Sequence, residues 1–345
     1  MILKVIMLVV FFAIMIGVGF YSRKQATDVN GFVLGGRSVG PWLTAFAYGT
    51  SYFSAVIFVG YAGQFGWKYG IASTWIGIGN AVLGSLIAWA VLGRRTRLIT
   101  QKLDSRTMPE FFERRYNSKS LKLVSSLIIF VFLIPYTASL YNGLSRLFGM
   151  AFEIDYKVCV IAMAALTGIY VIVGGYMATA INDFIQGIIM LFGIVVVIAA
   201  VLKNYGGLTG ALDKLANVSD PAVSSTPGVF ASFLGPDIFN LVCVVILTSL
   251  GTWGLPQMVQ KFYAIKDEKS IRTGTVVSTI FAVIVAGGCY FLGGFGRLTD
   301  TDVAAEGFDA IIPHLLECLP PILIGLVVIL VLSASMSTLS SLVLT

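Results

Sequence analysis

Midway along an apolar run from about Val39 to Phe65, the sequence reads Ala47-Tyr48-Gly49-Thr50-Ser51-Tyr52-Phe53-Ser54-Ala55. A helix surrounded by lipid is expected to consist of Leu, Ile and Val, whereas this run has glycine, hydroxyl residues and tyrosine at its midpoint. Backbone groups that leave the helical ladder inside a bilayer lose costly hydrogen bonds unless other partners satisfy them. The stretch therefore predicts a broken helix whose freed carbonyl groups bind an ion or a small molecule.

The composition identifies the class of protein. The chain has 345 residues, of which 57% are hydrophobic and 12% charged, and its mean hydropathy is +0.90. Soluble domains carry about 25% charged residues, so the chain is predicted to be an integral membrane protein embedded in a lipid bilayer. The net charge of +6 comes from loop residues and indicates membrane topology rather than nucleic-acid binding. The four cysteines show no CxxC or Cys/His spacing, so neither a disulfide framework nor a zinc site is indicated.

Nine apolar segments are long enough to span a bilayer, which needs about 20 residues. They are residues 2–22, 40–65, 71–93, 121–148, 157–176, 180–202, 237–260, 274–296 and 319–344. The first could be a signal peptide, but no small-x-small cleavage site precedes Ser22-Arg23-Lys24. We therefore expect a true spanning helix there.

The basic residues predict the orientation in the membrane. Most of the 23 Lys and Arg residues fall in the loops after the first, third and seventh segments, with Lys261 assigned to the last of these loops. The positive-inside rule places such loops in the cytoplasm. We expect a multi-pass protein of the plasma membrane, with the N-terminus outside and the C-terminal end of this chain inside.

Two loops are predicted to contain short helices. In the inward loop, Thr107 can cap a helix, Pro109 fits its first turn and Glu110 favours its positive end. This amphipathic helix is interpreted as a packed surface helix rather than a partner site. The outward loop 203–236 is rich in Gly, Ser and Pro, and one short helix is expected near Leu208–Leu215.

The seventh segment repeats the unusual pattern of the second. It reads Thr248-Ser249-Leu250-Gly251-Thr252-Trp253-Gly254-Leu255-Pro256-Gln257. Paired Gly/Pro interruptions at matching places in two halves of a membrane protein indicate the binding site of a transporter. An odd number of helices per half would place the halves in inverted orientation. The alternative is that both glycine runs serve only helix packing.

The ninth segment ends in Ser333-Ala334-Ser335-Met336-Ser337-Thr338-Leu339-Ser340-Ser341. By the i, i+3, i+4 rule, Ser333, Ser337, Ser340 and Ser341 fall on one face, with Thr338 beside them. Hydroxyl oxygens and freed carbonyls would form a neutral oxygen cage suited to a hard monovalent cation. The alternative is that these hydroxyls only bond back to the carbonyl four residues earlier.

Charged residues near the segments give weaker signals. Asp183 lies at the start of the sixth segment, where it is either a functional carboxylate within the membrane or a helix N-terminal residue that interacts with the dipole. The lone His314 and nearby Glu317 fall on an outward loop and do not make a catalytic set. The sequence shows no nucleophile elbow, P-loop or metal motif, so an enzyme is not expected.

The chain resembles the sodium/solute symporter family in a series of motifs. They are Gly35-Gly36-Arg37, Thr107-Met-Pro-Glu-Phe with Arg115-Tyr116, Gly174-Gly175 followed by Asp183-Phe-Ile-Gln186, and Met336-Ser337-Thr338-Leu339-Ser340. The resemblance implies an all-α LeuT-type inverted repeat in one transmembrane domain, residues 1–345. An extra helix (1–22) would precede a first five-helix repeat (40–202) and an incomplete second repeat (237–345). The last two core helices would be missing, so this chain is expected to be a fragment.

The resemblance also implies the ligand sites. A first sodium ion would be bound by the carbonyls of Thr50, Phe53 and Ala334 and the hydroxyls of Ser337 and Thr338. A second sodium site would consist of Asp183, Ser340 and Ser341. The solute would lie between the two broken helices, against Tyr52, Ser54, Thr252, Trp253 and Gln257.

The implied function is sodium-coupled symport of a small polar organic solute by alternating access, with sodium as the only cofactor. The alternative is a solute-sensing membrane module of a signalling protein that binds but does not transport. Proline carriers have an acid where this chain has Tyr52, and the glutamine of sugar carriers aligns with Ile57. These differences argue against both proline and sugars as substrates. The expected solutes are a monocarboxylate, a vitamin-like acid or an amino acid, in preference to a sugar.

Overall fold

A computed structural model describes residues 2–152 and 156–345, and these ranges contain helices, turns and isolated bridges but no strand. The helices that form the bundle are α1 (Ile2–Ser22), α3 (Pro41–Tyr52), α4 (Ala62–Tyr69), α5 (Thr74–Gly79) with the π-helical continuations Asn80–Ile87 and Trp89–Gly93, α6 (Arg94–Lys102), α8 (Lys119–Phe152), α9 (Tyr156–Asn204), α11 (Ile238–Leu250), α12 (Pro256–Ala264), α13 (Glu268–Gly293) and α16 (Pro321–Leu344). The remaining α-helices are α2 (Val29–Leu34), α7 (Met108–Tyr116), α10 (Gly207–Ala216), α14 (Val303–Glu306) and α15 (Ile311–Glu317). The expected all-α class is confirmed.

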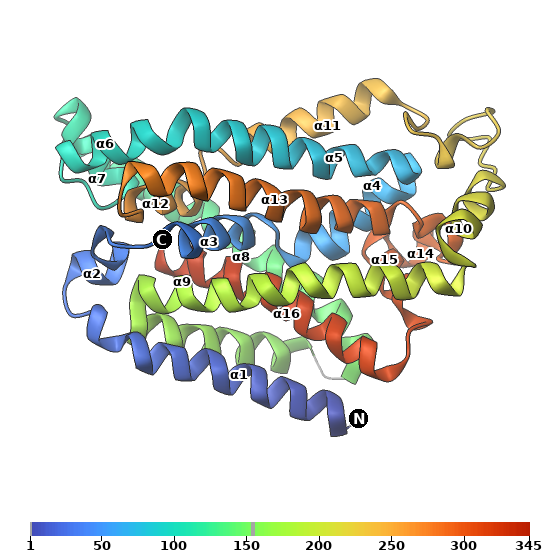
Figure 1. The fold of residues 1–345 in the computed structure, drawn as a ribbon, viewed down its shortest axis with the longest axis horizontal. Coiled ribbons are helices and arrows are strands. Elements are labelled where there is room, and N and C mark those ends of the chain that lie inside the picture. Colours follow the sequence, from blue (N-terminus) through green and yellow to red (C-terminus); the bar gives the residue numbers. More distant parts are fainter. Residues whose placement is uncertain (1, 153–155) are drawn as a thin grey trace.

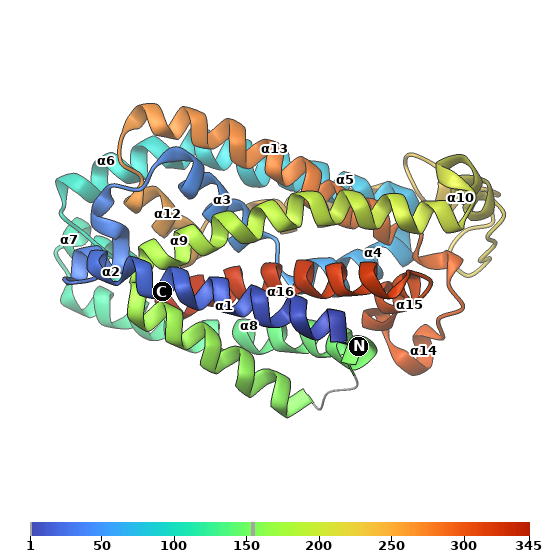
Figure 2. The same ribbon diagram turned by 60° about the horizontal axis from the view of Figure 1, so that its bottom comes forward.

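The long helices run side by side along the longest axis of the molecule (Figure 1). Helix α9 packs against α1, α3 and α16, and α13 packs against α3 and α5. Helices α2, α6 and α7 lie at one end of the bundle, and α10, α14 and α15 lie at the other (Figure 2). The described N-terminal residues and the C-terminus lie toward opposite ends of the axis.

Six helical stretches are long and apolar enough to cross a membrane, counting only the residues that the structure describes. Two of them, Val56–Lys102 and Val160–Asn204, each contain parts of two expected segments. In α9 the segments separate at Gly175, whose φ of +57° is a conformation that side chains other than glycine rarely adopt. Gly175 therefore sets the boundary that the sequence analysis placed between residues 176 and 180.

The first predicted break is confirmed. Helix α3 ends at Tyr52, Phe53 adopts an extended conformation with φ −102° and ψ 97°, and helical structure resumes as a π-helix at Val56. Gly49 allows α3 to approach α13, because a Cβ atom at this position would lie 2.4 Å from the Phe281 ring. The unusual composition thus serves both the break and a close helix crossing.

The second predicted break is also confirmed. Helix α11 ends at Leu250 and α12 begins at Pro256, after a short segment of turns. Leu255 has the extended conformation that a following proline favours. The isolated bridge between Val39 and Ile265 joins the chain before α3 to the chain after α12.

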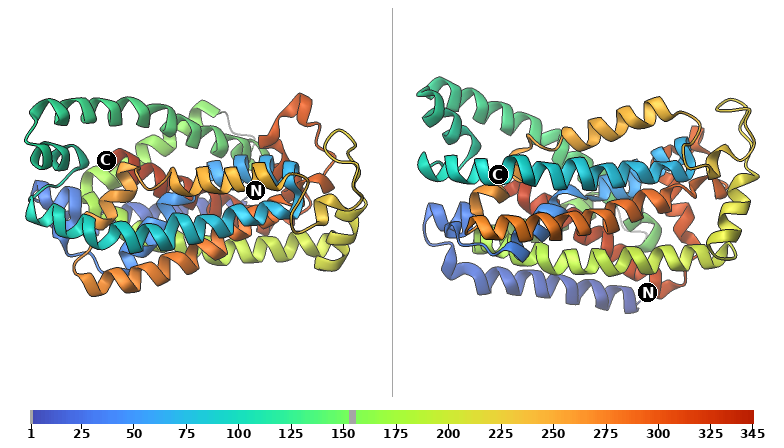
Figure 3. Two further views of the ribbon diagram at one scale, coloured as in Figure 1. Left: turned by 90° about the horizontal axis from the view of Figure 1, so that it is seen from above. Right: turned by 45° about the horizontal axis from the view of Figure 1, so that its top comes forward.

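The predicted short helices are present. Thr107 caps α7 by accepting a hydrogen bond from the Glu110 amide at 3.3 Å. Helix α10 covers the expected Leu208–Leu215, and Figure 3 shows it with the loop that follows at one end of the bundle. His314 differs from its expected place in a loop, because it lies on the short helix α15.

One assignment based on charge is wrong. Lys261 was counted with a cytoplasmic loop, but it lies within α12 and only 1% of its side chain is exposed. The break after Leu250 displaces the helix that follows, so that the seventh segment continues four residues past its expected end at residue 260. Lys261 therefore belongs to the buried interior and gives no information about topology.

Candidate functional site

Four oxygen atoms from α3 and α16 gather beside the first break. The hydroxyls of Ser337 and Thr338 lie 3.2 and 3.3 Å from the Thr50 carbonyl oxygen. Both hydroxyls also lie 3.1 Å from the Ala334 carbonyl oxygen. Thr50 directs its own hydroxyl back to the Phe46 carbonyl, whereas its carbonyl oxygen faces α16. The structure thus brings together four of the five residues expected at the first sodium site.

The fifth residue, Phe53, is the extended residue at the C-terminal end of α3, three residues after Thr50. All five residues are at least 98% buried. Every oxygen in the set is neutral and belongs to a hydroxyl or a backbone carbonyl, and such oxygens are the ligands that hard cations prefer. Broken helices of transporters coordinate Na⁺ through freed carbonyls in this way. The donor set therefore fits a sodium ion.

The residues expected at a second sodium site do not all meet. The Asp183 carboxylate is fully buried and lies 3.6 Å from the Lys261 ammonium. That ammonium donates a hydrogen bond of 3.0 Å to the Ser341 hydroxyl. Ser340 instead donates to the Ser337 carbonyl at 3.0 Å, within its own helix. The structure therefore joins Asp183 and Ser341 through a lysine that the sequence analysis did not assign to the site.

Asp183 does not have the place of a helix N-terminal residue. It follows the Gly175 kink by eight residues, and the dipole effect falls off within the first turn of a helix. The carboxylate contacts Lys261 of α12, and this lysine in turn contacts Ser341 of α16, so the surroundings of Asp183 come from tertiary structure.

The two breaks are joined by Tyr52, whose hydroxyl donates a hydrogen bond of 2.9 Å to the Thr248 carbonyl of α11. Next to this contact lies a cavity of about 970 Å³ between α3, α5, α8, α11 and α13. Among the residues expected to contact solute, Tyr52, Ser54 and Thr252 line this cavity. The cavity is thus bounded by both broken helices.

The other two expected solute contacts, Trp253 and Gln257, have different surroundings. The Trp253 indole donates to the Leu83 carbonyl at 3.0 Å, on the π-helical continuation of α5. Gln257 is fully buried in α12, and neither atom of its amide has a hydrogen-bond partner among the described residues. Neither side chain lines the 970 Å³ cavity.

Asn80 and Tyr290 line the cavity but were not expected from the sequence. The Asn80 amide oxygen accepts hydrogen bonds of 3.0 Å from Thr248 and from Ser249. The Asn80 amide nitrogen and the Tyr290 hydroxyl are buried beside each other, and neither makes a hydrogen bond of 3.5 Å or less among the described residues. A π-helical start at Asn80 is typical of functional positions in helices, but it leaves no pattern that the sequence reveals.

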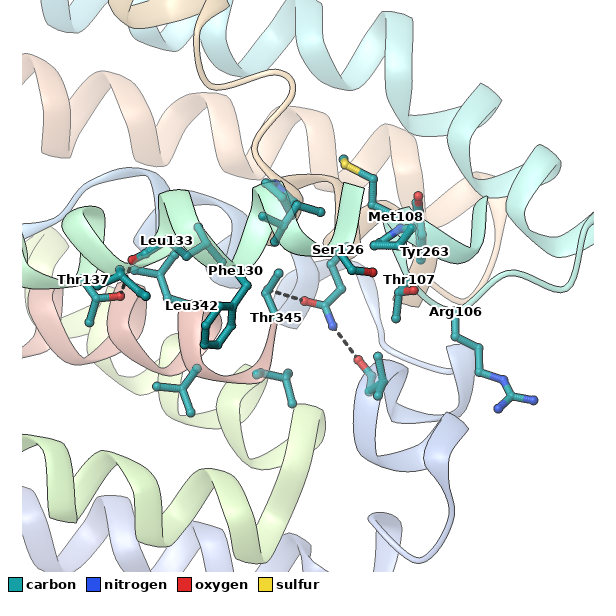
Figure 4. Close-up of a pocket in the computed structure, with 18 of the residues that line it drawn as sticks. Arg106, Thr107, Met108, Ser126, Phe130, Leu133, Thr137, Tyr263, Leu342 and Thr345 are labelled. Atoms are coloured by element: carbon teal, nitrogen blue, oxygen red, sulfur yellow. Dashed lines mark hydrogen bonds between the residues drawn. The ribbon is translucent and has the colours of Figure 1, made fainter. Parts of the chain in front are cut away.

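A second cavity of about 840 Å³ lies between α7, α8, α12 and the end of α16. Leu133 and Thr137 of α8, Leu342 of α16 and Thr345, which follows α16, surround it (Figure 4). Met108, Ile129, Leu133 and Pro256 line both cavities, so these side chains lie at the boundary between them. Together they extend from the breaks to the end of the bundle that carries α7.

Comparison with known proteins identifies the relatives of this architecture. The family model described as "Sodium:solute symporter family" matches residues 32–345. The osmoregulated proline transporter OpuE of Bacillus subtilis is 29% identical over 98% of this chain and 68% of its own length. A sodium/proline symporter of Staphylococcus aureus is 34% identical over 97% of this chain and 65% of its own length. The chain therefore spans about two thirds of these relatives.

A solved structure has the same fold. The substrate-bound outward-open state of a Na⁺-coupled sialic acid symporter superposes with a TM-score of 0.75 and 18% sequence identity. The match covers 98% of this chain and 70% of that protein.

Proposed function

Because the chain belongs to the sodium:solute symporter family, we propose that it couples sodium entry to the uptake of a small amino-acid-like solute through the α3–α16 oxygen cluster. Membership makes the chain a membrane transporter with sodium as its coupling ion, and not an enzyme. The observation that carries the proposal is the bridge from Ser337 and Thr338 to the Thr50 carbonyl, because it brings cation ligands from two helices together beside a helix break.

Sodium binding at this cluster would hold α16 against the break in α3. In its absence each hydroxyl has one proton to share between the Thr50 and Ala334 carbonyls. A cation at the centre would instead accept the lone pairs of both hydroxyls and both carbonyls, so α3 and α16 would be joined more strongly. Loss of the ion toward the cytoplasm would release this joint and allow the inward side to open.

The solute would lie in the 970 Å³ cavity next to the sodium site. The amide nitrogen of Asn80 and the hydroxyl of Tyr290 can each donate a hydrogen bond, and an unsatisfied buried donor costs about 1–3 kcal/mol. A solute carboxylate would satisfy both donors. An amino acid meets this requirement, and it agrees with the proline-transporting names of the relatives. A monocarboxylate or a vitamin-like acid would use the same donors.

The 840 Å³ cavity would be the release route to the cytoplasm. It leads from the breaks to the end of the bundle with α7, which would face the cytoplasm together with the C-terminus of this chain, since basic loops favour that side. The side chains at the boundary between the cavities, such as Met108 and Leu133, would move when the inward side opens.

The test is uptake into proteoliposomes that contain the purified protein. Labelled L-proline, a monocarboxylate and a neutral sugar would be offered under an inward sodium gradient and under an equal potassium gradient. We expect saturable, sodium-dependent uptake of the carboxylate-bearing solutes. Uptake that continues without sodium and does not saturate would indicate a channel. Solute-induced thermal stabilisation without uptake would indicate a sensing module.

A further inference from the structure

The buried Lys261 occupies the place at which the family resemblance implies a second sodium ion. Its Nζ atom lies 3.6 Å from Asp183 Oδ2 and 3.0 Å from Ser341 Oγ, two of the three groups expected to bind that ion. The Tyr176 ring lies 5.2 Å from the same nitrogen, within range of a cation–π contact. We propose that the Lys261 ammonium acts as a permanent, tethered second cation, so that this transporter binds one sodium ion.

The ammonium excludes sodium by charge. A sodium ion on the Asp183 carboxylate and the Ser341 hydroxyl would lie directly beside the ammonium, since both groups already contact it. Like charges repel strongly where water is absent, and the exposed fractions of Lys261 and Asp183 are 1% and 0%. One carboxylate neutralises one cation, so the pair is balanced without sodium.

The lysine cannot easily leave this place. It lies in the second turn of α12, and the chain around it is buried on all sides, from Gln257 to Ala264. A buried charge without a partner is strongly unfavourable, so Lys261 and Asp183 hold each other in position. The pair joins α12, which follows the second break, to α9 of the first repeat.

The tethered cation is also connected to the first site. Ser341 lies 2.8 Å from the hydroxyl of Ser51, and Ser51 follows Thr50 in α3. Helix α16 thus contacts the ammonium through Ser341 and the sodium ligands of α3 through Ser337 and Thr338. The lysine would replace a second ion structurally, because it would hold α16 against α3 and α9. It would not contribute to the driving force for solute uptake.

The inference rests on the proposed sodium site, and equilibrium binding of radioactive Na⁺ to the purified protein tests the two separately. We expect one ion per chain in the wild type and one in Asp183→Asn. Lys261→Met removes the ammonium but keeps a long apolar stem, and should raise the number to two. The double variant Lys261→Met/Asp183→Asn should return it to one. Lys266→Met is the matched control, because Lys266 is half exposed and should leave one ion bound.

Each other outcome has a definite meaning. Two ions in the wild type, or loss of the ion in a folded Asp183→Asn variant, would overturn the inference even if Lys261→Met failed to fold. A folded Lys261→Met variant with one ion would overturn it as well. No bound sodium in a folded wild-type protein would refute the proposed function itself.

Discussion

Replacement of Ser337 by alanine removes one hydroxyl from the α3–α16 oxygen cluster. This hydroxyl is fully buried and lies within 3.2 Å of two carbonyl oxygens, those of Thr50 and Ala334. Hydrogen-bonding contacts to charged groups contribute about 1.5–3 kcal/mol, and each 1.4 kcal/mol is tenfold in affinity. We therefore expect Ser337→Ala to weaken sodium binding by about 10- to 150-fold.

The cost should fall on the sodium-bound state more than on the fold. Without sodium, the hydroxyl contributes an ordinary hydrogen bond, which is worth about 0.5–1.5 kcal/mol net. With sodium, it is a ligand of a charge that water cannot reach. The melting temperature without sodium should therefore change little, whereas the rise in melting temperature upon sodium addition should need correspondingly higher concentrations.

The assay is a sodium titration of thermal unfolding, repeated as a sodium titration of solute uptake. Ser335→Ala is the matched control, because Ser335 is equally buried on the same helix but donates only to the Val331 carbonyl one turn earlier, at 2.8 Å. The control should keep the wild-type sodium dependence. Equal sodium dependence of Ser337→Ala and the wild type would refute the assignment of this cluster to sodium.

Three further predictions follow from single contacts. Gly49→Ala should destabilise the fold by about 1–3 kcal/mol, because the new Cβ atom would lie 2.4 Å from the Phe281 ring. The control Gly17→Ala meets no atom within 4 Å and should leave the stability unchanged, and thermal unfolding of the two variants tests this difference. Tyr52→Phe loses the 2.9 Å bond to the Thr248 carbonyl and should weaken solute binding up to about tenfold, which the KM for uptake measures. The hydrogen bond to Glu306 raises the pKa of His314 in the folded protein. The pair therefore stabilises the fold fully below the pKa that His314 has in the unfolded chain, and this stabilisation is lost as pH rises through the pKa of folded His314. NMR titration of this single histidine should show a lower pKa in Glu306→Gln, and an unchanged pKa would contradict the pairing.

The sequence reveals the parts of the site whose chemistry conflicts with lipid. Hydroxyl and glycine residues in the middle of apolar segments cannot be explained by contact with a bilayer, so the breaks after Tyr52 and Leu250 and the serines of α16 were predictable. The kink at Gly175 lies next to the boundary expected between residues 176 and 180, although no kink was predicted there. The predicted features depend on the residues of one short stretch, so they can be recognised from a single amino-acid sequence.

The parts that the sequence did not reveal depend on contacts between distant segments. Asn80 is 168 residues from Thr248, whose hydroxyl orients its amide, and nothing around Asn80 distinguishes it from a packing residue. Trp253 was expected to contact solute, but its indole nitrogen bonds to Leu83 instead. Spacing along a helix predicts which residues share a face, but not which neighbouring helix that face meets.

Lys261 shows how a charge near the end of an apolar segment can be misread. The positive-inside rule treats such a lysine as a loop residue, and the rule holds only if the segment crosses as one straight helix. When a segment breaks at its midpoint, the helix after the break can continue past the last apolar residue. Polar residues in that continuation can then lie inside the protein. Lys261 is buried for this reason, and it lies where Asp183 and Ser341 can satisfy it. In broken-helix transporters, a basic residue within two turns after a break should therefore be considered as a replacement for a bound cation before it is used to assign topology.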